Sequence, residues 1–408
     1  MLRFEDALAR ILALGSPPLP PEAVAIEDAE GRVLTEDLRA PADLPAFDYS
    51  AMDGYAVRAR DLDGAPPFEL PVRGESRTGA VPEPLAPRSA MRIFTGAALP
   101  EGADAVIMQE NVTRHGDVAV MTTKPRPGQA VRRRGEDLAK GAVAAAKGTR
   151  LRPAHLALAG AVDRAEVVVS RRPIVTILAT GDELRRPGTD PVPGTIPESI
   201  TYALRAMARR AGAETRAHPY VRDDRAATER AFSAALEDAD VLVTIGGVSV
   251  GDHDLVRPAL EAVGVELELW RVAIKPGKPI AIGRKRRGGQ RDAIVVGLPG
   301  NPASAMITFA VFGVPLLRAM QGDARPFPPF ARARMTRAHA HDPGRLELAR
   351  AVISHGESGL LVTTLGNQAS GAVTSTAQAD ALAIIPEDAT GVGAGDMVDV
   401  LLASDLGG

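Results

Sequence analysis

Apolar residues at the start of the chain recur with the spacing of a helix. The positions that share one helical face are Phe4, Leu8, Ile11 and Leu12. Acidic residues interrupt this apolar run, so it predicts an amphipathic helix rather than a signal peptide. The proline-rich stretch 16–21 ends the helix, and from about 40 to 150 short alternating segments punctuated by glycine and proline predict β-rich structure.

From Arg171 onward, apolar runs alternate with helical ones. Strand-like runs lie at 174–180, at 241–246, at 293–297 and in a segment that ends at Val221. Helix-like runs follow Ser199, Ala226, Asp254 and Asn301. This alternation predicts a central doubly wound α/β domain, with a mostly parallel sheet and helices on both faces.

The end of the chain changes pattern again. The stretch QGDARPFPPF after Met320 is aperiodic and predicts a linker, and the short segments beyond Ala331 predict a small β-barrel or sandwich. Three regions are therefore expected: 1–170, an elongated N-terminal region with an inserted β domain at about 44–145; 171–322, the doubly wound domain; and 328–408, a C-terminal β-barrel domain.

Composition narrows the class of protein. The chain has 408 residues, too many for one ordinary core, and is 45% hydrophobic and 24% charged, as in soluble globular proteins. The net charge of -3 gives no reason to expect nucleic acid or an anionic membrane as partner, and the basic run at 284–291 is interpreted as a solvated hairpin. No later run approaches the ~20 apolar residues that span a bilayer, so we expect a cytoplasmic protein.

Cysteine is absent from the sequence. Disulfides, zinc-thiolate sites, iron–sulfur clusters and thiol nucleophiles are therefore excluded. A bound metal must take oxygen or imidazole ligands.

Two loops that follow predicted strands carry acids and glycines. In a doubly wound sheet, ligands bind beyond the carboxyl ends of the strands. The loop Thr180–Glu183 offers a glycine and two acids, which suit a hard cation or proton transfer, or simply cap a helix. The loop Gly246–Asp254 offers three glycines ahead of a helix, a phosphate-binding arrangement, although a flexible turn capped by Asp254 explains it equally well. His253 is expected to be structural or exposed.

Two further loops carry lysines and a serine. Lys275 and Lys278 are two of only six lysines among 48 basic residues, and a compact ammonium suits an oxyanion; the alternative is a rigid exposed turn. The loop 298–302 precedes a helix, so that N-terminal amides and the Ser304 hydroxyl are expected to face the same crevice. Together the loops suit a phosphorylated ligand with a divalent cation, but leave phosphoryl transfer, adenylyl transfer and nucleotide binding open.

Several strings along the chain also resemble a known family. In order they are AMDGYAV at 51–57, FTGAALPEGADAVIMQE at 94–110, RRRGEDL at 132–138, TGDEL at 180–184, GGVSVGD at 246–252, AIKPGKP at 273–279 and GLPGNPASA at 297–305. They resemble the molybdopterin molybdenumtransferases, the bacterial MoeA proteins and the related E domain of gephyrin. The resemblance implies a MogA-like central domain that binds adenylated molybdopterin, and a homodimer whose cleft is completed by the partner's N-terminal region.

The resemblance also implies roles for individual residues. Catalytic roles fall on Asp53, Thr95, Asp137, Glu183 and Asp223. Substrate-binding roles fall on Gly181, Asp182, Gly246, Gly247, Ser249, Gly251, Asp254, Lys275, Pro299, Gly300, Asn301 and Pro302. Molybdate-binding roles fall on Lys278, Pro279, Ser304, Arg350 and Ser370. Mg²⁺ is the implied cofactor, with Asp223 and Asp254 as its ligands.

The implied reaction is the last step of molybdenum cofactor biosynthesis. Molybdate or activated water attacks the pterin adenylate, AMP is released, and the pterin dithiolene takes the molybdenum. The pterin supplies the sulfur, so the enzyme contributes positioning and electrostatics rather than covalent catalysis. Either Asp53 or Glu183 is the base.

The chain departs from the family pattern at Tyr49 and Ile200, where an asparagine is usual. Three alternatives stand beside the transferase. The adenylyltransferase of the preceding step shares the central domain, but does not account for the N-terminal and C-terminal motifs. A gephyrin-like scaffold has no use for clustered charges. A tungstate-specific enzyme differs only in its anion.

Overall fold

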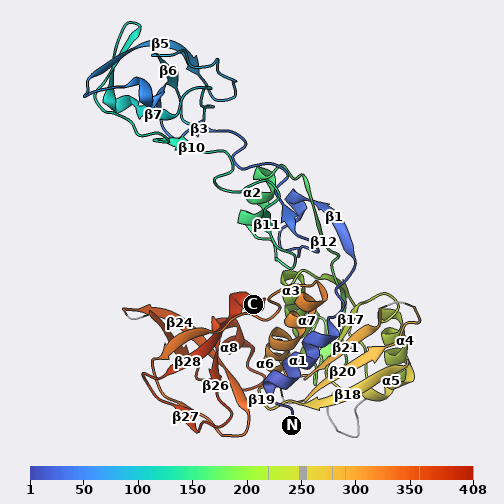
Figure 1. Ribbon diagram of the computed structural model, residues 1–408. Coiled ribbons are helices and arrows are strands. Elements are labelled where there is room, and N and C mark those ends of the chain that lie inside the picture. Colours follow the sequence, from blue (N-terminus) through green and yellow to red (C-terminus); the bar gives the residue numbers. More distant parts are fainter. Residues whose placement is uncertain (219, 248–254, 278, 290, 358, 408) are drawn as a thin grey trace.

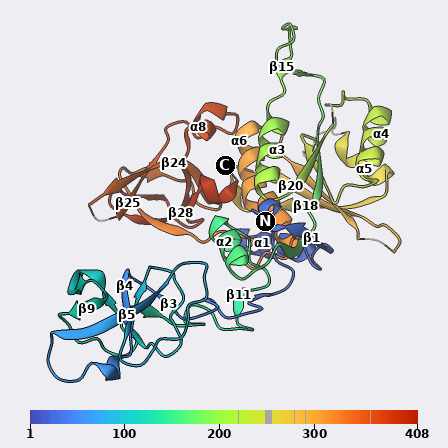
Figure 2. The same cartoon turned by 90° about the horizontal axis from the view of Figure 1, so that it is seen from above.

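The computed structural model describes residues 1–218, 220–247, 255–277, 279–289, 291–357 and 359–407. The molecule is elongated (Figure 1). A β domain stands at one end, a narrow neck follows, and a wide base holds an α/β domain and a C-terminal β domain side by side. The view from above shows the same parts (Figure 2).

The first helix belongs to the base of the molecule. Helix α1 (Phe4–Leu14) buries Phe4, Ala7 and Ile11, which confirms the predicted amphipathic helix. The rings of Phe4 and Phe312 lie 5.6 Å apart, so α1 packs on the helical layer of the α/β domain. Residues 15–20 form no helix or strand, as their prolines predict.

The neck consists of short paired strands and one helix. Its elements are β1 (Pro21–Ala25), η1 (Ile26–Asp28), β2 (Leu38–Arg39), β11 (Val143–Ala145), α2 (Pro153–Ala161) and β12 (Glu166–Ser170). Strand β1 pairs antiparallel with β12, and β2 pairs antiparallel with β11. The chain thus passes through the neck in both directions, out to the β domain and back.

The β domain at the far end confirms the β-rich prediction. Its sheet has the order β7-β4-β6-β5-β9-β8. The strands of this sheet are β4 (Gly54–Val57), β5 (Phe68–Ser76), β6 (Ala90–Ile93), β7 (Ala105–Met108), β8 (Val112–His115) and β9 (Val118–Met121). Strands β3 (Tyr49–Ser50) and β10 (Val131–Arg132) form a separate pair. Two short helices, η2 (Ala59–Asp61) and η3 (Gln109–Asn111), lie between strands.

The α/β domain holds a six-stranded sheet of order β16-β13-β17-β21-β20-β18. Its strands are β13 (Ile174–Ala179), β16 (Glu214–Ala217), β17 (Val241–Ile245), β18 (Val265–Arg271), β20 (Pro279–Lys285) and β21 (Ala293–Leu298). The first four in spatial order are parallel, whereas β20 runs antiparallel to both neighbours. The mostly parallel sheet is confirmed, with one reversed strand.

Helices cover both faces of this sheet, as predicted. They are α3 (Ile200–Arg210), α4 (Arg225–Ala235), α5 (Val256–Ala262), α6 (Pro302–Thr308), the π-helical turn η4 (Phe309–Gly313) and α7 (Val314–Met320). Successive strand residues point to opposite faces. Accordingly Val243 packs with α3, α6 and α7 in one core, and Leu242 packs with α4 and α5 in the other.

The C-terminal domain is a five-stranded barrel. Strands β24 (Leu346–Gly356), β25 (Gly359–Thr364), β22 (Ala331–Met335), β28 (Met397–Leu402) and β26 (Ala381–Ile385) pair in this order, and β26 pairs back with β24. The remaining elements of the described chain are the paired strands β14 (Leu184–Arg185) and β15 (Ile196–Pro197), and β19 (Ile274–Lys275), β23 (His339–Ala340), β27 (Gly391–Val392), α8 (Val373–Gln378) and η5 (Ala403–Leu406). The predicted linker 321–330 contains no helix or strand.

Two sequence expectations need correction. The helical stretch Pro302–Met320 is 19 residues long and apolar enough to cross a membrane, contrary to the expectation that no apolar run approaches that length. Of its most apolar window, 83% is buried, as in a core helix.

The basic run at 284–291 does connect paired strands, but it is not wholly solvated. Arg287 donates to Ala239 O at 2.8 Å and Arg291 donates to Gly15 O at 2.9 Å, so both guanidinium groups bind backbone carbonyls.

Candidate functional site

The loops singled out in the sequence meet at one edge of the sheet. In the parallel register Ala179 lies beside Ile245, and Ile245 lies beside Leu298, so the loops that follow β13, β17 and β21 leave the sheet together. Because β20 is reversed, β18 runs parallel to β21 and the loop after Arg271 leaves at the same edge. We call this edge the crevice.

The glycine loop and the loop after β21 are in direct contact in the crevice. Gly246 N donates to Leu298 O at 3.0 Å, and a Cβ at Gly300 would lie 3.6 Å from Gly246 Cα. Gly246 and Gly247 have φ of +86° and +62°, which side chains disfavour. Of the other residues predicted here, Ser249, Gly251, His253 and Asp254 lie outside the described residues.

The acidic loop gains a partner from the loop between β16 and α4. Asp182 N donates to Asp223 Oδ2 at 3.4 Å, and Asp223 N donates to Asp182 Oδ1 at 3.2 Å. Both residues and Glu183 are exposed. A Cβ at Gly181 would lie 2.8 Å from Glu183 Oε1, so the Glu183 side chain folds back over the glycine. Two predicted carboxylates, those of Asp182 and Asp223, therefore lie together at the crevice, and Glu183 follows Asp182 in the same loop.

The C-terminal barrel closes the other side of the crevice. Ser370 O accepts hydrogen bonds from Ala303 N at 3.0 Å and from Ser304 N at 3.4 Å. The predicted Ser304 and Ser370 are thus neighbours, although they are 66 residues apart in sequence. The amides of Ala303 and Ser304, which are expected to face the crevice, both donate to the Ser370 carbonyl.

Arg350 lies under this contact. Its side chain is almost fully buried, with 1% exposure. Nη2 donates to Asn367 O at 3.2 Å and to Ala369 O at 3.0 Å, which holds the segment before Ser370. Nε and Nη1 are buried and have no hydrogen-bond partner among the described residues. Burial lowers the pKa of Arg350, and the charge of Glu347 opposes this shift.

The lysine loop reaches the barrel as well. Lys275 lies in β19, which pairs parallel with β24, and its Nζ lies 3.1 Å from Glu347 Oε1. A Cβ at Gly277, where φ is +108°, would collide with Thr308 Oγ1, so this loop lies tightly against α6. Pro279 begins β20 and is half-buried; Lys278 lies outside the described residues.

The N-terminal residues of the predicted site lie elsewhere. Asp53 Oδ1 accepts hydrogen bonds from Thr95 N at 2.7 Å and Thr95 Oγ1 at 2.8 Å, and these bonds hold the pKa of Asp53 below its usual value. Asp137 is exposed, and its N donates to Leu44 O at 3.1 Å. Asp53 directly precedes β4, at the opposite end of the molecule from the crevice (Figure 1). One chain therefore does not bring Asp53 and Thr95 to the other site residues.

The two departures from the family pattern have different surroundings. Tyr49 is half-buried in β3, where it pairs with Arg132. Ile200 begins α3, and Glu198 caps this helix: its Oε1 accepts from Ile200 N at 2.7 Å and from Thr201 N at 2.9 Å. Glu198, which the sequence patterns did not single out, thus caps the start of α3, where this chain has Ile200 in place of the usual asparagine.

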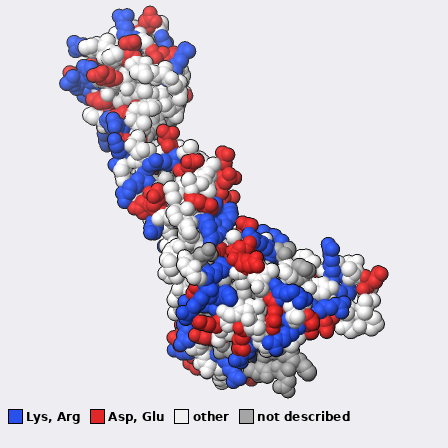
Figure 3. Space-filling model, turned by 90° about the vertical axis from the view of Figure 1, so that its right-hand side faces the viewer, with Lys and Arg blue, Asp and Glu red and all other residues white. Residues whose placement is uncertain are grey.

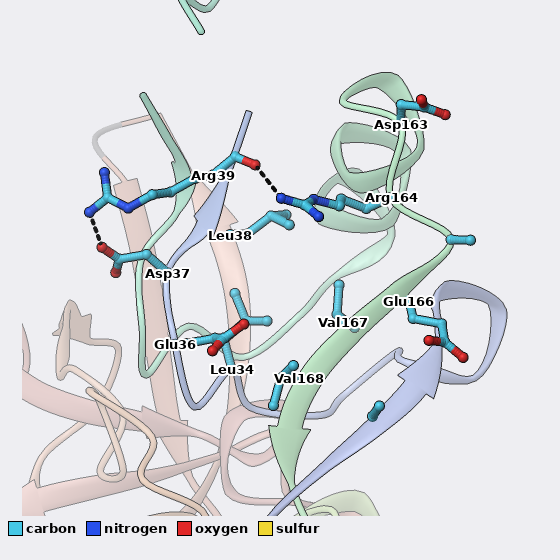
Figure 4. Close-up of a pocket in the computed structure, with 12 residues that line it drawn as sticks. Leu34, Glu36, Asp37, Leu38, Arg39, Asp163, Arg164, Glu166, Val167 and Val168 are labelled. Atoms are coloured by element: carbon cyan, nitrogen blue, oxygen red, sulfur yellow. Dashed lines mark hydrogen bonds and ion pairs between the residues drawn. The ribbon is translucent and has the colours of Figure 1, made fainter. Parts of the chain in front are cut away.

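One cavity lies away from all the predicted site residues. A cavity of about 510 Å³ lies in the neck, lined by residues of the segments 34–39 and 163–168 (Figure 4). Two of its arginines have partners within it: Arg39 Nη2 lies 2.7 Å from Asp37 Oδ2, and Arg164 Nη2 donates to the backbone Arg39 O at 3.4 Å. None of the predicted site residues lines it. Over the neck, acidic and basic side chains are interspersed (Figure 3).

Sequence reasoning also missed three titratable residues near Lys275. They are His339, His341 and Glu347, and Glu347 is only 2% exposed. No local signal marks them, because an acid or a histidine on a strand is usually an exposed residue. Their burial depends on the contact between the barrel and the lysine loop.

Comparisons with known proteins cover nearly the whole chain. Family models match at residues 2–162 (MoeA N-terminal region, domains I and II), 176–319 (probable molybdopterin binding domain) and 332–403 (MoeA C-terminal region, domain IV). The molybdopterin molybdenumtransferase of Haemophilus influenzae is 36% identical over 404 residues, covering 98% of each chain. That of Bacillus subtilis is 36% identical over 396 residues, covering 95% of this chain and 91% of its own.

Solved structures agree. A molybdopterin biosynthesis MoeA protein from Pyrococcus horikoshii matches with a TM-score of 0.85 and 29% identity, covering 98% of this chain and all of its own. A second structure of such a protein matches with a TM-score of 0.79 and 33% identity, covering 98% of this chain and 99% of its own. Because these matches include the N-terminal and C-terminal regions, a central domain acting alone does not explain them. The chain belongs to the MoeA family of molybdopterin molybdenumtransferases.

Proposed function

We propose that the chain transfers molybdenum from molybdate to adenylated molybdopterin, with Mg²⁺-dependent release of AMP. The observation that carries this proposal is Arg350, whose buried Nε and Nη1 have no partner among the described residues. A buried cation with unpaired donors is costly unless an anion supplies the missing acceptors. A tetrahedral oxyanion between Arg350, Ser304 and Ser370 would do so.

The opposite side of the crevice suits the phosphates of the adenylate. Asp182 and Asp223 bring two carboxylates together, and Mg²⁺ is typically bound by one or two carboxylates plus substrate phosphates. No group of three or more candidate ligands occurs in the part of the chain that the structure describes, so we assign the remaining positions to phosphate oxygens and water. When bound, the ion would neutralise the charge that develops on the phosphate.

We also propose that the working unit is a homodimer. Asp53 and Thr95 stand on the β domain, remote from the crevice of their own chain. A second copy would bring its β domain to that crevice, and each cleft would then combine residues of two chains. An ionised Asp53, held so by Thr95, would face the adenylate as a base or as a further acceptor.

The test combines two readouts. Purified protein is incubated with molybdopterin adenylate, Mg²⁺ and molybdate, and AMP release is followed beside reconstitution of an apo-molybdoenzyme. Both signals are expected to require molybdate. Arg350→Ala should weaken molybdate binding roughly 10–100-fold, because it removes a charge-assisted hydrogen bond of about 1.5–3 kcal/mol. Arg332→Ala, which removes a 60%-exposed arginine of the same barrel, should change neither signal.

The outcomes separate the alternatives. Adenylate that binds but stays intact would indicate a scaffold or binding paralogue instead of a transferase. Adenylate that does not bind at all would overturn the proposal. Competition between molybdate and tungstate in the same assay decides which anion is the preferred substrate.

A further inference from the structure

We propose that Lys275 belongs to the anion site and that Glu347 is the positioning residue that holds it there; this inference rests on the proposed function. Glu347 lies near the start of β24, directly beside Lys275 in the parallel pairing of β19 with β24. It is 2% exposed, and it comes from the barrel, whereas Lys275 comes from the loop between β18 and β20. The contact therefore joins two domains.

Each oxygen of the Glu347 carboxylate has its own partner. Oε1 lies 3.1 Å from Lys275 Nζ. Oε2 lies 2.7 Å from Nδ1 of the buried His341 and 3.4 Å from Nε2 of His339. The imidazole of His341 fixes one side of the carboxylate, so the other side is held towards the lysine.

The carboxylate is ionised in these surroundings. Burial alone would raise the pKa of Glu347, but hydrogen bonds from His341 and Lys275 outweigh it and keep the pKa below its usual value. A lysine has a flexible four-carbon stem and does not fix its own direction. A buried anion at a fixed position confines the ammonium, and a buried charge in turn requires that partner.

The same strand also carries the arginine of the anion site. Arg350 follows Glu347 by three residues on β24, and the Glu347 charge acts on its pKa. Glu347 thus fixes the place of Lys275, and its charge also acts on the arginine of the anion site.

The direction in which Glu347→Gln changes the affinity for molybdate distinguishes positioning from other roles. In Glu347→Gln, loss of the negative charge alone would strengthen binding of an anion. Loss of positioning would weaken it, because Lys275 would no longer be held. A purely structural role would lower thermal stability and leave the molybdate affinity of the folded protein unchanged.

We therefore expect Glu347→Gln to raise the Kd for molybdate, measured by calorimetry on the full chain without adenylate, by roughly fivefold or more. The matched control is Glu357→Gln, which removes the same charge from the exposed turn between β24 and β25. An unchanged or lowered Kd in folded Glu347→Gln would overturn the inference. If that variant does not fold, His341→Asn should give a smaller weakening in the same direction, and unchanged affinity there would count equally against it.

A double-mutant cycle tests whether Glu347 acts through Lys275. In a Lys275→Ala background, Glu347→Gln should cause no further loss of molybdate affinity, because the group being positioned is gone. Additive losses would refute positioning. The two proposals can fail separately: wild-type protein that binds molybdate but releases no AMP contradicts the proposed function, whereas an unaltered Kd in Glu347→Gln contradicts only this inference.

Discussion

At the scale of single residues, several side chains of the site are held by partners that fix their charge. Asp53 is paired with Thr95, Glu347 with Lys275 and His341, and Arg350 with backbone carbonyls. Such pairing keeps a charged group in one protonation state and one direction, which suits chemistry based on positioning.

The pairing of Asp53 predicts how its titration responds to mutation. Hydrogen bonds from the Thr95 backbone and hydroxyl lower the pKa of Asp53 below 3.8. They therefore stabilise the fold at pH values above 3.8, and this stabilisation is lost as the pH falls through the lowered pKa of the folded state. Thr95→Val removes only the hydroxyl. We expect the pKa of Asp53 to rise but to stay below 3.8, as read from carboxyl carbon chemical shifts. Thr113→Val, at an exposed threonine of the same domain, should leave it unchanged.

At the scale of elements, the reversed strand β20 decides where the lysine loop lies. Its antiparallel pairing with β18 and β21 returns the chain to the crevice edge, where the glycine loop and the acidic loop already lie. Close backbone approach at this edge depends on glycine: Gly246 has φ of +86°, and a Cβ there would lie 3.5 Å from Thr180 O.

This geometry predicts different effects for two glycines with similar backbone angles. Gly246→Ala and Gly289→Ala both place a side chain at positive φ, which costs about 1–2 kcal/mol of stability, measured by urea unfolding. Gly246 lies in the crevice, whereas Gly289 lies between β20 and β21 at the opposite edge of the sheet, where a Cβ would meet nothing within 4 Å. We expect adenylate affinity to fall in Gly246→Ala and to be unchanged in Gly289→Ala. Equal affinities would place the phosphate site elsewhere.

At the scale of the whole molecule, the elongated shape separates residues that we propose to act together. The neck keeps the β domain away from the crevice of its own chain (Figure 1). We propose a second copy because it would bring Asp53 to Lys275 without unfolding either domain.

Shared clefts predict complementation between inactive variants. Coexpressed Asp53→Asn and Lys275→Ala chains form mixed dimers with one intact cleft each, and random pairing should restore about a quarter of wild-type AMP release. The pair Lys275→Ala and Arg350→Ala should restore nothing, because both changes fall in the crevice of one chain. Failure of the first pair, or a monomer by gel filtration, would contradict the shared cleft.

Local patterns in the sequence were enough to predict the types of the main elements and the loops that carry the candidate residues. Helical spacing marked α1, which buries one face, whereas continuous apolar runs marked β13, β17 and β21, which are buried on both faces. Strand ends then located the acidic and glycine loops. The residue limits of the three regions, and the roles carried over to single residues, stay predictions.

Tertiary structure alone decided how distant segments meet. Ser370 on Ser304, Glu347 on Lys275 and Asp223 on Asp182 are contacts between segments at least 41 residues apart. The packing of α1 on the α/β domain, and not on the neck that follows it in sequence, is likewise a contact between distant segments. The physical reason is that strand and helix patterns depend on neighbours in sequence, whereas the burial of Glu347 and Arg350 depends on how two finished domains pack.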